Sequence, residues 1–108
     1  MMKKLALMAV WASVFVAGAA LAGGNPVAGK AKSKRCAACH GPDGNSPSPD
    51  FPKLAGQNYD YLFKALTDYK AGERSSPIMA PQVANLTGRD MEDLAAYFAS
   101  QKGLYYKY

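Results

Sequence analysis

Two thiols and one imidazole stand together in the pentapeptide Cys36-Ala37-Ala38-Cys39-His40. The spacing C-x-x-C-H is used to attach a c-type haem covalently. Each thiol adds across one vinyl group of the porphyrin, and two cysteines about one helical turn apart reach two vinyls on the same edge of the macrocycle. The neutral imidazole of His40 then lies beneath the iron and serves as its proximal ligand. The motif therefore predicts one covalently bound haem c.

Other chemistries also use a C-x-x-C pair. A thioredoxin-like redox motif needs a βαβ context, and no segment with strand periodicity surrounds these cysteines. A structural zinc site needs four ligands, whereas the chain has two cysteines and one histidine in total. A plain disulfide in an exported protein stays open, but it leaves His40 without a role. Haem attachment is the interpretation that uses all three side chains.

The second axial position of the iron calls for another ligand. His40 is the only histidine, so bis-histidine coordination within one molecule is excluded, and methionine is the remaining strong candidate. Met91 falls on the apolar stripe of a predicted helix, where core packing is favoured. Met79 instead lies in a loop between Pro77 and Pro81, from which a flexible thioether can reach across the macrocycle. We therefore expect His40 and Met79 to be the axial ligands of the iron.

The first 22 residues predict an export signal rather than a part of the fold. Lys3 and Lys4 form a basic start, an apolar stretch covers 5–21, and Ala20-Leu21-Ala22 has the small-x-small pattern of a cleavage site. Cleavage after Ala22 places one mature domain, 23–108, in the periplasm. An uncleaved anchor helix is the alternative, because the stretch is near the lower length limit for spanning a bilayer.

The size and charge of the mature chain restrict its function. Removing 22 of 108 residues leaves 86, and the hydrophobic core of so small a domain is only marginally stable without a bound group or a cross-link. We therefore expect the haem-free protein to be poorly folded.

The net charge of +5 falls to +3 with the loss of Lys3 and Lys4, which is too small to indicate nucleic-acid binding. Basic residues precede the haem motif and acidic residues open the last predicted helix: Lys30, Lys32, Lys34 and Arg35 against Asp90, Glu92 and Asp93. Such a charge separation can orient a docking partner, although a solvated helix face explains it equally.

Helical periodicity and capping residues predict an all-α fold with three main helices. Asn25 as cap and Pro26 at the first position start a helix that is expected to run up to the haem-binding cysteines. No segment alternates with a period of two, so a sheet is not expected. Two long loops, 41–57 and 73–86, remain, and we expect them to wrap the two faces of the haem.

The second and third helices have clear ends. The second is expected from Asn58 as cap to near Gly72, and the third from a capping box of Thr87 and Asp90 to a stop at Gly103. Each has one apolar stripe with helical spacing: Tyr59, Leu62, Phe63, Leu66 and Tyr69 or Lys70 in the second, and Met91, Leu94, Ala95 and Phe98 in the third.

With the haem motif near its start and a methionine loop before its last helix, the mature chain resembles the class I cytochromes c. It is most similar to small monohaem periplasmic members related to single domains of dihaem cytochromes of denitrifying bacteria. The resemblance covers residues 26–102. It is carried by Ala28-Gly29-Lys30, Cys36 to Gly41, Phe51 to Gln57, Tyr61-Leu62, Gly72-Glu73-Arg74, Met79 and Leu94 to Phe98.

The resemblance implies roles for further residues. Pro52 matches the proline whose carbonyl accepts the Nδ1 hydrogen bond of the proximal histidine, and Gly29 matches the glycine where the first and last helices cross, against Tyr97 or Phe98. Some relatives bind a haem propionate with a tryptophan. The mature chain has none, so that role passes to others such as Gln57 or Arg74, and the choice stays open.

A haem with His on one face and Met on the other has no open position for a substrate, which predicts a single-electron carrier and not an enzyme. Redox proteins are expected to dock transiently at the haem edge, and contact with a membrane is expected only through membrane-bound redox complexes. Two alternatives remain. One is a haem-bearing subunit of a larger oxidase or dehydrogenase complex, and the other is a five-coordinate haem enzyme or gas sensor.

Overall fold

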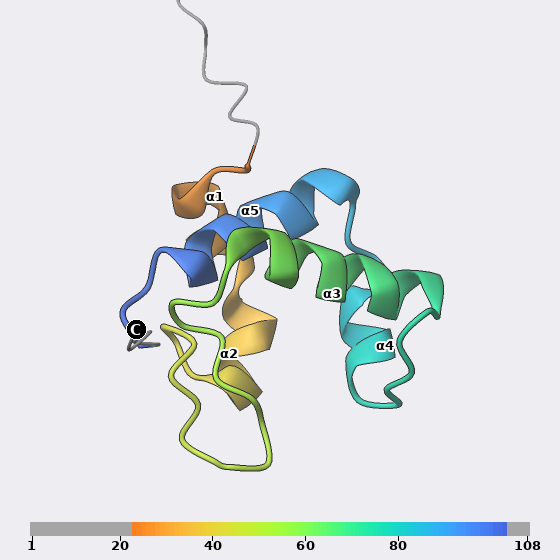
Figure 1. Cartoon of the computed structure of the whole chain (residues 1–108), viewed down its shortest axis with the longest axis horizontal. Coiled ribbons are helices and arrows are strands. Elements are labelled where there is room, and N and C mark those ends of the chain that lie inside the picture. The colour runs from red at the N-terminus through yellow and green to blue at the C-terminus, as the bar shows by residue number, and fades with distance from the viewer. Residues whose placement is uncertain (1–22, 104–108) are drawn as a thin grey trace, which may run out of the picture.

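The computed structural model describes residues 23–103, which contain five α-helices and, within that range, no strand. The helices are α1 (Pro26–Lys32), α2 (Lys34–His40), α3 (Tyr59–Ala71), α4 (Met79–Val83) and α5 (Gly88–Ala99). α5 lies between α1 and α3, while α2 and α4 lie below this layer (Figure 1). The predicted export signal, 1–22, lies outside the described residues. Within the described part, no helix has the length and apolar character needed to cross a membrane.

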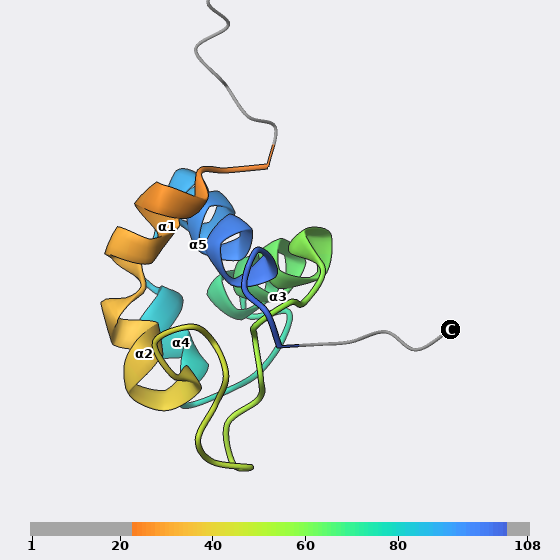
Figure 2. The same ribbon diagram turned by 90° about the vertical axis from the view of Figure 1, so that its left-hand side faces the viewer.

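α1 and α5 cross at Gly29, which the sequence predicted as the site of a close approach (Figure 2). A Cβ atom on this residue would collide with the carbonyl of Asp93 and would lie 2.7 Å from the Cβ atom of Tyr97. Only glycine lets the two backbones come this near. Of the two aromatic residues expected at the crossing, Tyr97 packs there, whereas Phe98 contacts Gly44 in the loop after α2.

An ion cluster around the buried residue Asp93 ties the same two helices together. The carboxylate of Asp93 is 3% exposed, and it accepts hydrogen bonds from the backbone N–H of Asn25 at 2.8 Å and from Nζ of Lys32 at 2.7 Å. Nζ of Lys32 also lies 2.9 Å from a carboxylate oxygen of Asp90. Lys32 is therefore neutralised within the fold, and the basic cluster expected to face a partner is reduced to Lys30, Lys34 and Arg35.

The helix predicted from Pro26 to the cysteines is divided in two at Ser33. The hydroxyl of Ser33 donates to the carbonyl of Lys30 at 2.7 Å, and its backbone N–H bonds the same carbonyl at 3.2 Å. A serine that satisfies a carbonyl of the preceding turn in this way ends the regular ladder. α1 can then lie along α5, while α2 turns away and carries the haem motif downwards (Figure 1).

α3 and α5 begin at their predicted caps, Asn58 and Thr87, and α3 ends at the predicted Gly72. α5 ends earlier than predicted. The hydroxyl of Ser100 donates to the carbonyl of Tyr97 at 2.7 Å, which stops the helix at Ala99. Gly103 was therefore wrong as the stop. It lies instead against Ala55 in the loop 41–57, where a larger side chain would collide.

The two predicted loops differ in structure. The loop 41–57 has no helix and is held by backbone hydrogen bonds, from Leu54 to Gly44 at 2.8 Å and from Gly56 to Phe98 at 3.0 Å. The loop 73–86 contains α4, which the sequence analysis missed because five residues are too few to show a helical period. Met79 is thus the first residue of a short helix rather than part of an irregular loop.

Candidate functional site

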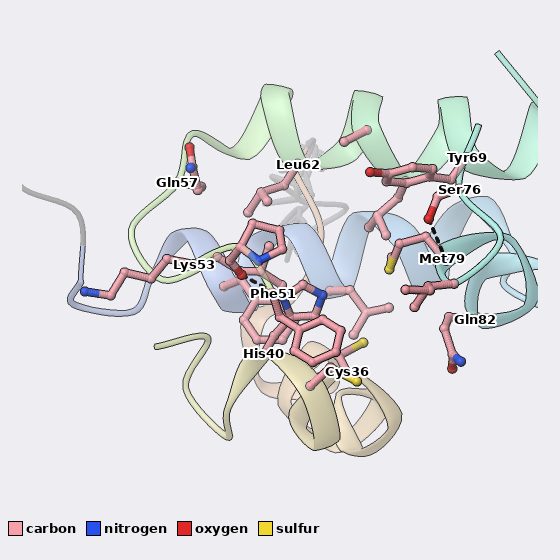
Figure 3. A pocket seen from close by; sticks show the side chains of 18 of the residues that line it. Cys36, His40, Phe51, Lys53, Gln57, Leu62, Tyr69, Ser76, Met79 and Gln82 are labelled. Atoms are coloured by element: carbon pink, nitrogen blue, oxygen red, sulfur yellow. Dashed lines mark hydrogen bonds between the residues drawn. The ribbon is translucent and has the colours of Figure 1, made fainter. Parts of the chain in front are cut away.

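A cavity of about 250 Å³ lies between α2, α3, α4, α5 and the loop 41–57. Its lining includes all four residues that the sequence assigned to the haem, namely Cys36, Cys39, His40 and Met79. Figure 3 shows Cys36, His40 and Met79 converging on this space from two helices that are far apart in the sequence, α2 and α4. The rest of the lining is mainly apolar, so a bound planar group would be shielded from water.

α2 presents both thiols to the cavity. Cys36 and Cys39 are three positions apart on this helix, so their side chains share one face about one turn apart. Both are free and half-buried. Burial raises the pKa of the Cys36 thiol, because the charged thiolate would lose its hydration. Two free thiols at this spacing on one wall match the two vinyl groups of a porphyrin edge.

The imidazole of His40 is buried and fixed in orientation. Its Nδ1 lies 2.7 Å from the carbonyl oxygen of Pro52, to which it donates a hydrogen bond. A carbonyl can only accept, so this contact sets the tautomer and leaves Nε2 free as a metal-binding atom. The ring of Phe51 meets His40 edge-on, with 6.3 Å between the ring centroids. The polypeptide therefore holds one imidazole nitrogen and leaves the other available for coordination.

The segment after His40 is anchored to α5. Gly41 has a φ of +85°, a conformation that glycine adopts without strain, and it lets the chain leave α2 sharply. The carbonyl of the next residue, Pro42, accepts a hydrogen bond from the hydroxyl of Tyr97 at 2.7 Å. Tyr97 thus packs at the α1–α5 crossing with its Cβ atom and positions the haem-motif loop with its hydroxyl.

Met79 reaches the cavity from the other direction. It is half-buried at the start of α4, and its sulfur points toward the cavity, across from α2 (Figure 3). Its backbone N–H is bonded to the hydroxyl of Ser76 at 3.0 Å. Met91, the other methionine in the described residues, is 5% exposed in α5 and does not line the cavity. The arrangement agrees with a packing role for Met91.

One wall of the cavity is the apolar stripe of α3. Leu62 is its only buried residue, while neighbouring side chains are half-buried or exposed and face the cavity. Leu62, Leu66 and Tyr69 of the predicted stripe line the cavity together with Tyr61 and Ala65. Tyr59 and Phe63, the other predicted members, pack against the core instead. An amphipathic helix normally buries such a stripe against a partner. Here the cavity takes the partner's place, which indicates that a large apolar group belongs in it.

Charged residues in the lining are confined to its exposed edge, and most are basic: Arg35, Lys53 and Arg74 against Asp50. The guanidinium of Arg74 lies 4.8 Å from the centre of the Tyr69 ring, and it lies 3.5 Å from the hydroxyl of Tyr61. Gln57, the other candidate for binding a propionate, also lines the cavity. The structure therefore places both candidates at the cavity.

The residues present fit a haem and do not fit the other candidates for a C-x-x-C pair. In the described residues, no three His, Cys, Asp or Glu side chains are close enough to hold a metal ion, which argues against zinc. The two cysteines are not joined, and no strand flanks them within residues 23–103. Two thiols, an oriented imidazole, a thioether and an apolar wall together suit a covalently attached porphyrin.

Comparisons with known proteins agree with this fit. The family model for cytochrome c matches residues 26–102. Cytochrome c4 of Pseudomonas aeruginosa is 50% identical over 101 residues, which cover 94% of this chain and 50% of that protein. Cytochrome c-554(548) of Halomonas halodenitrificans is 38% identical over 82 residues, which cover 73% of this chain and 99% of that protein.

A comparison with solved structures also agrees with a covalently bound haem. Reduced recombinant cytochrome c4 from Pseudomonas stutzeri superimposes with a TM-score of 0.72 at 49% identity, covering 75% of this chain and 47% of that one. The chain thus spans about half the length of the cytochromes c4 it matches. Its helical fold is that of the class I cytochromes c. The chain belongs to the cytochrome c family and binds one covalent haem c through Cys36 and Cys39.

Proposed function

We propose that this protein is a single-electron carrier in which His40 and Met79 are the two axial ligands of the haem iron. The observation that carries the proposal is that both side chains line one cavity and reach it from opposite elements, α2 and α4. When bound, the haem supplies a reversible one-electron couple, and methionine ligation raises its potential. With both axial positions taken, no site remains for a substrate.

The polypeptide's part is to hold both ligands in one arrangement through each redox cycle. Pro52 keeps the His40 ring from rotating, and Tyr97 holds the turn that follows it. The apolar stripe of α3 excludes water from the macrocycle. A site whose ligands do not move needs little reorganisation when its charge changes, and this suits electron transfer rather than bond chemistry.

Partners are proposed to be redox proteins that dock transiently at the cavity edge. The exposed charges there are mostly basic, so an acidic surface would complement them and the association would weaken with salt. We further propose that residues 1–22 are removed on export, so that the domain 23–108 acts in the periplasm. Contact with a membrane would then occur only through membrane-bound redox complexes.

The second candidate function is that of a haem-bearing subunit of a larger oxidase or dehydrogenase complex. One relative favours it by name: a cytochrome subunit of sulfide dehydrogenase from Chlorobaculum tepidum, 39% identical over 72 residues. A thiosulfate dehydrogenase electron acceptor from Stutzerimonas stutzeri, 41% identical over 75 residues, is named as a partner of a dehydrogenase and agrees with either candidate. The haem would transfer electrons in the same way in either case. Purification without detergent, followed by a test of whether the protein elutes alone or with a complex, separates the two candidates.

The ligand assignment is tested by exchanging each methionine for leucine in the haem-loaded full chain. Met79→Leu keeps the side-chain volume but removes the sulfur, so we expect the weak red absorption band of oxidised methionine-ligated haem to disappear. The reduced variant should also bind carbon monoxide. Met91→Leu is the matched control, because Met91 lies outside the cavity, and it should keep the band.

An unchanged spectrum in Met79→Leu would reject Met79 as the ligand. Rapid stoichiometric carbon monoxide binding by the unaltered reduced protein would instead favour the five-coordinate enzyme or sensor.

A further inference from the structure

Ser76 begins the segment that carries Met79. Its hydroxyl oxygen accepts the backbone N–H of Met79 at 3.0 Å, and its carbonyl oxygen accepts the N–H of Ala80 at 3.0 Å (Figure 3). These are the two bonds that an N-cap residue makes, from its side chain and its carbonyl to the third and fourth residues after it, and here they close a turn that leads into the regular part of α4 at Met79. Pro77 follows at the first position, where proline is favoured because its missing N–H costs nothing.

The segment has few other anchors. α4 has five residues, far fewer than an isolated helix needs for stability, and Val83, at 1% exposure, is its only buried residue. Beyond α4, Nζ of Lys70 donates to the carbonyl of Leu86 and ties that end of the segment to α3. At the beginning of the segment, the backbone N–H of Arg74 donates to the carbonyl of Asp68 in α3 at 3.1 Å. Between these two ties, the bonds of Ser76 are local, and they fix the backbone turn at the residue whose side chain enters the cavity.

We propose that Ser76 is a positioning residue for Met79. By holding the Met79 N–H, it fixes the backbone from which the thioether extends and so keeps the sulfur on the iron. The inference rests on the proposed function, in which Met79 is an axial ligand. It adds a residue that controls the fraction of molecules in which this ligand is bound. Ser76 also lines the cavity, so the hydrogen bond that it makes lies next to the haem site.

The expected effect follows from the usual cost of removing an N-cap. Replacing a capping serine by alanine destabilises a helix end by about 1 kcal/mol, which at an RT of 0.59 kcal/mol is about fivefold in an equilibrium constant. The fraction of molecules with Met79 detached should rise by this factor. An external ligand binds only to that fraction, so its apparent affinity rises equally.

The test is a titration of the oxidised, haem-loaded full chain with imidazole, followed by loss of the red methionine band. For Ser76→Ala we expect about fivefold tighter imidazole binding than for the unaltered protein. Two further variants isolate the hydroxyl. Ser76→Thr keeps an acceptor and should bind imidazole like the unaltered protein, whereas Ser76→Val has the same shape without the acceptor and should behave like Ser76→Ala.

Thr87→Ala is the matched control for a loss of overall stability caused by removing any helix cap. The hydroxyl of Thr87 accepts the N–H of Asp90 at 3.1 Å, the same kind of bond at the start of α5, a helix that carries no ligand. Thr87 does not line the cavity. Its removal should lower the midpoint of thermal unfolding but leave the imidazole affinity within about twofold.

Three results would overturn the proposal: unchanged imidazole affinity in both Ser76→Ala and Ser76→Val, an equal rise in Thr87→Ala, or no difference between the Thr and Val variants. Failure of the proposed function gives a different result, because Met79→Leu would then keep the red band whatever Ser76 does.

Discussion

α3 and α5 are alike as isolated helices and differ in what covers them. They have 13 and 12 residues, both begin at a side-chain cap, and both have one apolar stripe. Six residues of α5 are buried, against one of α3. α5 is enclosed by α1 on one side and α3 on the other and turns only Leu94, Ala95 and Phe98 to the cavity, whereas α3 turns much of its stripe to it. A helical stripe thus predicts that a face will be covered, but it does not identify the covering group.

The difference divides the domain into two regions: one is packed by protein alone, and the other requires the haem for its packing. The α1–α5 crossing is completed by protein alone, through Gly29 and the cluster of Lys32, Asp90 and Asp93. The wall formed by α3 and α4 is completed by the haem. Loss of the haem should therefore damage the second region first, and substitutions at the crossing should act even with the haem in place.

The largest effect is expected from removing haem attachment with Cys36→Ala together with Cys39→Ala. The wall of α3 then loses its apolar partner, and a domain of this size has little stability to spare, so most of the free energy of unfolding, on the order of 5 kcal/mol, should be lost. Hydrogen exchange should show α3 and α4 losing protection, with residual protection at the α1–α5 crossing. A cooperative thermal transition like that of the haem-loaded protein would contradict the division.

A smaller but still large effect is expected from Gly29→Ala at the crossing. Alanine favours an isolated helix by about 1 kcal/mol, but here its Cβ would meet the backbone of α5, so we expect a net loss of about 3 kcal/mol. Denaturant unfolding of the haem-loaded protein measures it. Gly88→Ala is the control, because a Cβ there meets nothing within 4 Å, and it should change stability by less than about 0.5 kcal/mol.

The ion cluster gives the smallest predicted change and a dependence on pH. The backbone N–H of Thr87 and the ammonium of Lys32 lower the pKa of Asp90 to about 2. Burial alone would raise the pKa of Asp93, but its bonds to Lys32 and Asn25 outweigh burial and lower it. Carboxylates with depressed folded-state pKa values stabilise the fold above their unfolded pKa, near 4, and this contribution is lost as the pH falls toward 2.

Asp93→Asn should accordingly cost about 2 kcal/mol at pH 7 and should flatten the fall in stability between about pH 4 and pH 2. Denaturant unfolding of the haem-loaded protein across this pH range measures both effects. Asp60→Asn, at an exposed position in the first turn of α3, is the control: it loses only the attraction of its charge to the helix dipole, less than about 1 kcal/mol, and should leave the pH profile unaltered. An unaltered pH profile in Asp93→Asn would show that the cluster does not contribute to acid stability.

Much of the fold could be predicted where the signals are local. The caps Asn25, Asn58 and Thr87 were placed correctly, because a capping residue bonds within three positions of itself. The break at Ser33 and the start of α4 were missed. Ser76-Pro77 is a recognisable cap pattern, but the five residues of α4 contain no apolar period to draw attention to it.

What the amino-acid sequence determined by itself is the chemistry of attachment, since two thiols and an imidazole within five residues face one way on any helix. It also predicted Met79 as the second ligand, because Met91, the other methionine of the mature chain, falls on an apolar helical stripe. Only the tertiary structure brought Met79 to the same cavity as His40 and joined Asn25 and Lys32 to Asp93, and it shows the bond from Nδ1 of His40 to the carbonyl of Pro52 that the family resemblance implied. These contacts link residues that are 12 to 68 positions apart, and no local pattern encodes them. They arise because the helices have to pack around one another and around the haem at the same time.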